Sequence, residues 1–145
     1  MASASEKTRI DFHSNVADKL NYACRLIRKA RHAQCKVVVY HPDREELQRI
    51  DAALWTLEDT GFLPHVMADD PLASVTPIIL SQGNLENSPH VELLVNLSAS
   101  TPDNFEVFAR MIEIVSSEVA DTNAGRERYR YYHQQAFPLS HNVAK

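Results

Sequence analysis

Residues 125–139, GRERYRYYHQQAFPL, hold the densest group of side chains in the chain that could bind a charged ligand. Because an α-helix turns by about 100° per residue, one side of a helix here would carry four of them: Arg126, Tyr129, Arg130 and His133. The opposite side would carry Arg128, Tyr131 and Tyr132. Two guanidiniums beside a phenol ring can hold a carboxylate while the ring packs against an apolar group. The alternative is an amphipathic closing helix with half-buried tyrosines and solvated arginines.

Two small groups of titratable residues come nearest to a catalytic or metal site. They are His41 with Asp43, and His65 with Asp69 and Asp70. Both histidines lie near the ends of expected strands, where α/β proteins often bind ligands. The histidines form no H-x-x-x-H pair and the cysteines form no C-x-x-C pair, so no metal is expected. Ordinary turn chemistry is the favoured interpretation of both groups.

The phosphate-binding loops of nucleotide-binding proteins are absent. The three glycines, Gly61, Gly83 and Gly125, lie far apart, and neither G-x-G-x-x-G nor G-x-x-x-x-G-K-[ST] occurs. Without such glycines the backbone cannot approach a pyrophosphate at the first turn. A G-x-S-x-G nucleophile elbow is also missing. The sequence therefore predicts a chain without a nucleotide cofactor.

Length and composition indicate one cytoplasmic domain. A chain of 145 residues can bury a core without disulfides, so Cys24 and Cys35 are expected to be reduced structural thiols. The net charge of −4 argues against a surface for duplex nucleic acid. The first residues lack the apolar region of a secretory signal, and no apolar run approaches the ~20 residues that cross a bilayer.

Strand-like and helix-like segments alternate, which predicts an α/β fold with a mostly parallel sheet and helices on both faces. The expected strands are residues 9–13, 36–41, 63–67, 75–82, 91–98 and 111–116, the last of which ends the sheet. The expected helices begin at Asn15, at Asp43, at Thr101 and before Arg126. Residues 1–8 are expected to be a loose lead-in, and residues 9–145 to form the domain.

Capping signals support these helix starts. Asn15 and Thr101 can each cap a helix, and Asp43 with Glu46 resembles a capping box. The helix after Thr101 would turn three side chains inward: Phe105, Phe108 and Ala109. The polar side of the first helix carries a basic run, Lys19, Arg25, Arg28 and Lys29. We interpret this run as a solvated outer face, with a nucleic-acid surface as the alternative.

An unusual concentration of large apolar residues follows the helix that begins at Asp43. Trp55, the only tryptophan, is followed within ten residues by Phe62, Leu63 and Pro64. Surface connections seldom carry so many apolar groups. Two interpretations remain: Trp55 folds back over the edge of the core, or the segment is an exposed patch for a partner protein.

Three separated motifs give the chain a resemblance to a known family. They are ID-x-ALW at 50–55, F-x-PH at 62–65, and RERY-x-x-Y from Arg126 with Phe137 following. In this order and spacing they resemble the chi subunit of bacterial DNA polymerase III holoenzyme, over about residues 9–139. The resemblance implies a Rossmann-like domain without a nucleotide site, and an adaptor that is not an enzyme.

The resemblance also implies partners and contact residues. Chi proteins link the clamp loader, through a small psi subunit, to the acidic C-terminal tail of single-stranded DNA-binding protein, and so meet DNA only indirectly. The residues matching the psi-facing surface are Trp55, Phe62 and Pro64. Those matching the tail site are Val115, Arg126 and Tyr129. Family members can carry a lysine where this chain has Thr122, and Arg130 is expected to replace part of that charge.

Two other function classes stay open at this stage. One is a small α/β enzyme that uses His41 or His65, which turnover lost on changing those histidines would reveal. The other is direct binding of single-stranded nucleic acid through arginine and tyrosine stacking, against which the negative net charge argues. Direct binding would persist without the DNA-binding protein, whereas an adaptor needs that protein present.

Overall fold

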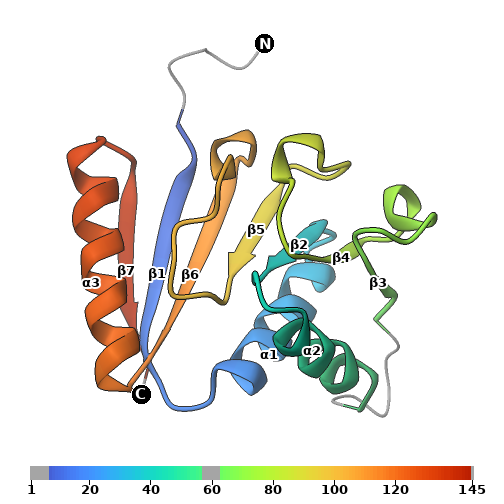
Figure 1. Ribbon diagram of the computed structural model, residues 1–145, viewed down its shortest axis with the longest axis horizontal. Helices are drawn as coiled ribbons and strands as arrows, with labels where there is room; N and C mark the ends of the chain where they lie inside the picture. Colours follow the sequence, from blue (N-terminus) through green and yellow to red (C-terminus); the bar gives the residue numbers. More distant parts are fainter. Residues whose placement is uncertain (1–6, 57–62, 145) are drawn as a thin grey trace.

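The computed structural model describes residues 7–56 and 63–144, which contain one sheet of seven strands (Figure 1). The strands are β1 (Arg9–Val16), β2 (Val37–Tyr40), β3 (His65–Met67), β4 (Ile78–Ser81), β5 (Leu93–Asn96), β6 (Arg110–Ser116) and β7 (Leu139–Val143). Their order is β3-β4-β2-β5-β6-β1-β7, and every adjacent pair is parallel. The predicted α/β class with a parallel sheet is confirmed, and no nucleotide-binding loop is seen in the described residues.

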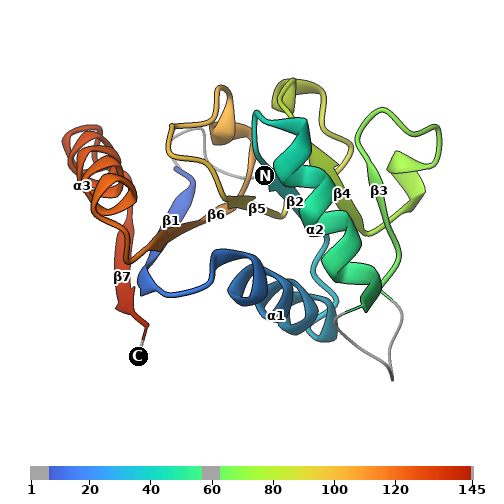
Figure 2. The same cartoon turned by 60° about the horizontal axis from the view of Figure 1, so that its bottom comes forward.

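Three helices cover the two faces of this sheet. α1 (Lys19–His32) and α2 (Arg44–Thr56) pack over one face, and α3 (Val119–Gln134) packs over the other. Figure 2 shows α1 and α3 on opposite sides of the strands. No helix within the described residues is long and apolar enough to span a bilayer.

The central strands supply the core, as their sequences predict. Val37, Val38 and Val39 of β2 are at most 1% exposed, because neighbouring strands flank them and a core cluster packs on each face of the sheet. A continuous apolar run is the pattern expected of a strand buried on both faces. Cys24 is on the buried side of α1, where burial raises the pKa of its thiol to about 11. Cys24 and Cys35 are both free.

The first helix begins later than predicted. Asp18, and not Asn15, caps α1, because its carboxylate accepts a hydrogen bond from the backbone N–H of Asn21 at 3.1 Å. Asn15 instead adopts a left-handed backbone conformation with φ 59°, where the β1–β6 register shifts between His13 and Val16. Asparagine tolerates this conformation better than most residues. Val16, expected on the helix, therefore ends β1.

The predicted helix after Thr101 is wrong. The chain forms only one 3₁₀ turn there, Phe105–Val107, because Asn104 enters it with φ 64° and breaks any helix started at Pro102. Phe105 and Phe108 are buried as expected, but Ala109 is exposed. Hydrophobic spacing alone does not distinguish a single turn that buries two rings from a full helical stripe.

A seventh strand follows α3 and was not predicted. Strand 111–116 is therefore not the last of the sheet, because β7 pairs with β1 at its outer edge. The β7 sequence, LSHNV, is mostly polar and half-exposed, so it lacks the apolar pattern that marks a strand. The lead-in predicted at residues 1–8 lies mostly outside the described part, although the Thr8 hydroxyl donates to the carbonyl oxygen of Phe108 at 2.7 Å.

The turn before α2 explains the pairing of His41 with Asp43. The Asp43 carboxylate accepts from the backbone N–H of Glu45 at 2.9 Å, which caps α2. The backbone N–H of Asp43 donates to Nδ1 of His41 at 3.0 Å. His41 thus has the role that a capping box would give to Glu46.

A buried charged network holds α3 against the sheet. Glu113 of β6 has no exposed surface, and Arg128 of α3 is 4% exposed. One carboxylate oxygen of Glu113 accepts from Nε and Nη2 of Arg128 at 3.2 and 3.0 Å, and from the Asn96 amide at 2.9 Å. The other accepts from the Tyr132 hydroxyl at 2.6 Å, and Nη1 of Arg128 donates to the Ala99 carbonyl at 2.9 Å. Arg128 and Tyr132 lie on the inner side of the helix, opposite Arg126, as the helical spacing predicts.

Replacing Arg128 by alanine is expected to destabilise the fold severely. The change leaves the Glu113 carboxylate buried without its partner, which costs about 3–5 kcal/mol. Arg126→Ala, on the exposed side of α3, is the matched control and is expected to cost at most about 0.5 kcal/mol. Urea unfolding of both variants measures the difference. Equal stabilities would show that the buried pair does not hold α3.

Candidate functional site

A cavity of about 700 Å³ lies between α3 and the strands β1, β6 and β7. Its described lining residues are Phe12, Ser14, Asn15, Val115, Thr122, Gly125, Arg126, Tyr129, Arg130, His133 and His141. The four residues predicted to share one side of α3 therefore lie together in this cavity. Val115, singled out by family resemblance, forms part of its floor. We call this cavity the α3 pocket.

The strands place the floor and one wall of the α3 pocket. Side chains alternate along a strand, so Phe12 and Ser14 of β1 face α3 while Asp11 and His13 face away. His141 of β7 lies beside Phe12 in the parallel register. Its Nε2 lies 2.7 Å from the Ser14 hydroxyl oxygen, and its ring centroid is 6.1 Å from that of Tyr129. β7 thus contributes a histidine that no sequence pattern identified.

Gly125 allows α3 to come close to the pocket floor. A Cβ at this position would lie 2.9 Å from both methyl carbons of Val115, closer than real Cβ contacts allow. The helix can pack at this depth only because residue 125 lacks a side chain. Val115 and Phe12, each 3% exposed, then form an apolar floor against which the Tyr129 ring packs, 5.1 Å from the Phe12 ring.

The charge of the α3 pocket is positive. Arg126 and Arg130 are exposed, and neither guanidinium makes an ion pair within the described residues. None of the described lining residues is acidic. Thr122 stands one turn before Arg126, and its hydroxyl donates to the Ser116 carbonyl at 3.1 Å, so it adds no charge. An apolar floor below two unpaired guanidiniums suits a ligand with an apolar group beside a carboxylate.

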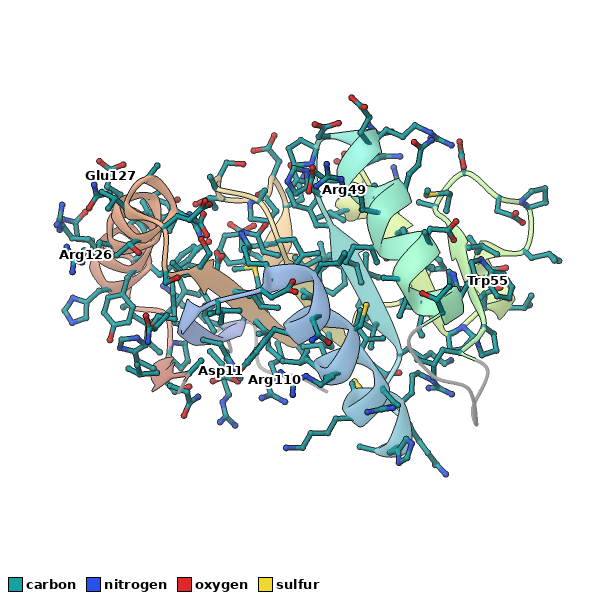
Figure 3. The ribbon with its side chains drawn as sticks, turned by 90° about the horizontal axis from the view of Figure 1, so that it is seen from below. Asp11, Arg49, Trp55, Arg110, Arg126 and Glu127 are labelled. Carbon is teal, nitrogen blue, oxygen red and sulfur yellow. The ribbon has the colours of Figure 1, made fainter. Side chains whose placement is uncertain are left out.

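A second exposed feature lies at the end of α2. Trp55 is 55% exposed, so it is not a core residue, and Pro64 beside β3 is also exposed. The Trp55 ring lies 4.9 Å from the ring of His65 (centroid to centroid), and Figure 3 shows the indole at the end of α2 away from α3. Phe62, the third residue of the predicted partner surface, lies outside the described residues.

The histidines considered for catalysis have structural contacts. His65 begins β3, at the amino edge of the sheet, and its side chain has no exposed surface. Its Nδ1 donates to the Leu63 carbonyl at 2.6 Å, and its Nε2 lies 3.0 Å from a carboxylate oxygen of Asp51. His41 lies at the carboxyl edge in a separate cavity of about 350 Å³, where burial lowers its pKa. No group of three potential metal ligands occurs in the described residues.

Comparison with known proteins identifies the family. The model of the family described as "DNA polymerase III chi subunit, HolC" matches residues 8–140. The chain belongs to the DNA polymerase III chi subunit family. The match includes β1, β6 and α3, which form the α3 pocket together with β7, and α2, which carries Trp55.

Three curated members of the chi family show how far the likeness extends. The chi subunit of Pseudomonas aeruginosa is 31% identical over 136 residues, covering 91% of this chain and 94% of that protein. The chi subunit of Haemophilus influenzae is 29% identical over 118 residues, covering 81% and 82%. That of Escherichia coli is 24% identical over 117 residues, covering 81% and 80%.

Gly125→Ala is expected to perturb the α3 pocket through Val115. The added methyl group clashes with both Val115 methyls, and overpacking costs about 1–3 kcal/mol, only partly offset by the ~1 kcal/mol higher helix propensity of alanine. The double variant with Val115→Ala removes the clash, so the two changes should be non-additive by more than about 0.5 kcal/mol. Denaturant unfolding of the four proteins measures this coupling. Additive effects would show that the close approach is not constrained.

Proposed function

We propose that this chain is a non-catalytic adaptor of the replisome. In this role the α3 pocket holds the acidic C-terminal tail of single-stranded DNA-binding protein, and the surface around Trp55 holds a psi-type subunit of the clamp loader. Membership of the chi family supports the replisome role. The observation that carries the tail assignment is the two guanidiniums of Arg126 and Arg130, which have no ion pair among the described residues and lie above an apolar floor.

The chemistry of such a tail matches the α3 pocket group by group. Arg126 would hold the terminal carboxylate, while Val115 and Tyr129 would contact the apolar side chain next to it. Arg130 would attract acidic residues upstream, which compensates in part for the neutral Thr122. Because the arginines are exposed, added salt is expected to weaken the complex.

Arg126→Ala is expected to weaken binding of a tail peptide about ten- to hundredfold, since a charge-assisted hydrogen bond contributes about 1.5–3 kcal/mol. Arg49→Ala is the matched control, because Arg49 is an exposed arginine of α2, with a side chain 72% exposed. Arg128 is unsuitable as a control because it is buried in the Glu113 pair. Fluorescence anisotropy with a labelled tail peptide at two salt concentrations gives the affinities.

A peptide with an amidated C-terminus tests the atom that Arg126 contacts. Amidation should weaken peptide binding to the wild-type chain about as much as Arg126→Ala does. It should weaken binding to the Arg126→Ala variant little, because both changes remove the same interaction. If Arg126→Ala and Arg49→Ala have equal effects, the tail binds elsewhere. If amidation is equally costly in both backgrounds, Arg126 does not hold the carboxylate.

Trp55→Ala is expected to weaken association with a psi-type subunit by about 2 kcal/mol, roughly thirtyfold, as for an exposed aromatic anchor. The melting temperature should change little, because the indole is half exposed. Leu54→Ala is the contrasting variant, since Leu54 is 3% exposed and its truncation should cost about 2–5 kcal/mol of stability. Thermal melting and titration with the subunit test both statements. A large melting-temperature loss for Trp55→Ala would assign Trp55 to the core.

A further inference from the structure

Two arginines share one buried carboxylate at the amino-terminal ends of β1 and β6. Arg9 and Arg110 are direct partners in the parallel register. Nε of Arg110 lies 2.7 Å from one carboxylate oxygen of Asp11, and Nε of Arg9 lies 3.3 Å from the other. The Asp11 side chain is 2% exposed, whereas those of Arg9 and Arg110 are 64% and 46% exposed. The carboxylate is therefore internal, and the guanidiniums meet solvent.

The geometry leaves the outer nitrogens of both guanidiniums available. Each arginine contacts Asp11 through Nε, and neither makes a hydrogen bond through Nη1 or Nη2 within the described residues. Burial alone would raise the pKa of Asp11, but the Ser140 hydroxyl donates to it and Arg110 and Arg9 lie beside it, so its pKa is lowered. Asp11 thus stays ionised at neutral pH and fixes both arginines side by side.

Helix α1 brings further positive charge to the same face of the sheet. Arg25 and Lys29 are exposed, and Tyr22 of α1 contacts His13 of β1 through its hydroxyl. Burial lowers the pKa of His13, and the positive charges of Arg110 and Lys29 lower it further against the opposing effect of Asp11. Lys29 and Arg110 therefore act on the same imidazole from different elements. Figure 3 shows Asp11 and Arg110 beside α1.

We call Arg9, Arg25, Lys29 and Arg110 the basic face. Arg9 and Arg110 flank the buried Asp11 carboxylate, and Arg25 and Lys29 add charge from α1 on the same face of the sheet, although the whole chain carries a net charge of −4. Glu92 and Arg110 both lie near Cys35, and the Glu92 carboxylate accepts a hydrogen bond from the backbone N–H of Lys36. Charge is therefore distributed unevenly over the chain, and the negative net charge does not prevent this face from binding a polyanion.

We propose that the basic face binds the phosphodiester backbone of single-stranded nucleic acid. Guanidinium groups bind phosphate oxygens in pairs through their outer nitrogens, which are the nitrogens that Asp11 leaves available. The choice of a single strand over a duplex rests on the proposed function, because a partner tail in the α3 pocket comes from a protein on single-stranded DNA. Successive β1 side chains face opposite sides, so the basic face and the α3 pocket can be occupied together.

Anisotropy titration of a labelled twenty-nucleotide oligo(dT) with the full chain, without any DNA-binding protein, tests this proposal. We expect a Kd of about 10–100 µM at ~50 mM salt, within the range of non-specific binding. About three phosphate contacts would give a slope of log K against log salt near −2. Arg9→Glu with Lys29→Glu should weaken binding at least about tenfold and flatten the slope, because it removes two such contacts. Arg110 is left unchanged because it neutralises buried Asp11.

Matched charge reversals on α2 provide the control. Arg44→Glu with Arg49→Glu changes the net charge by the same amount on exposed arginines, with side chains 50% and 72% exposed, outside the basic face. This variant should retain binding within about threefold, and Arg126→Ala should retain it too while losing tail binding. No binding at 1 mM chain, equal losses in both double variants, or loss in Arg126→Ala would overturn the proposal. Equal affinity for duplex would overturn the choice of a single strand.

Discussion

The orientation of α3 depends on one buried charge. Glu113 lies inside the sheet with no exposed surface, and a carboxylate there needs hydrogen-bond donors from every side. Arg128 and Tyr132 supply them from α3, one turn apart, and Asn96 supplies another from β5. Burial, together with the nearby carboxylate, raises the pKa of Tyr132, which keeps its hydroxyl a proton donor. A helix tied at two successive turns cannot rotate about its axis.

This constraint determines what the outer side of α3 presents. With Arg128 turned into the sheet, Arg126 and Arg130 lie about 160° from it and Tyr129 about 100° from it. The same attachment that satisfies Glu113 therefore directs two guanidiniums away from the core and one phenol along the pocket floor. Gly125 determines how deeply the helix packs onto the sheet, through its close approach to Val115. The geometry of the candidate site therefore follows from core packing.

The sequence predicted those parts of the fold whose signals are local. The valine run of β2, the basic and aromatic spacing of α3 and the absence of phosphate loops each reflect chemistry within a few residues. The errors have non-local causes. β7 is a strand because β1 offers it a free edge, whereas the left-handed conformations of Asn15 and Asn104 delay the start of α1 and break the helix predicted after Thr101. Helical spacing also placed Arg128 opposite Arg126 but gave no sign that its guanidinium pairs with the buried carboxylate of Glu113.

The same limits apply to the candidate site. Helical spacing grouped Arg126, Tyr129, Arg130 and His133, and the structure brings all four to one cavity. His141 and Phe12 could not be found this way, because they reach the cavity through strand pairing between opposite ends of the sequence. The contact of Asp11 with Arg9 and Arg110 was not predicted, for a similar reason. Arg110 meets Asp11 from a position 99 residues away, and no local motif connects them.

The pairing of β1 with β7 has a consequence for the order in which the molecule matures during synthesis. β1 is made before its partners β6 and β7, so it must wait for both of these later strands to emerge from the ribosome. Contacts between such distant segments form slowly, because a long loop must close before they contribute. A chain truncated before β7 therefore lacks His141, which forms part of the wall of the α3 pocket, and the pocket is complete only after β7 has been made.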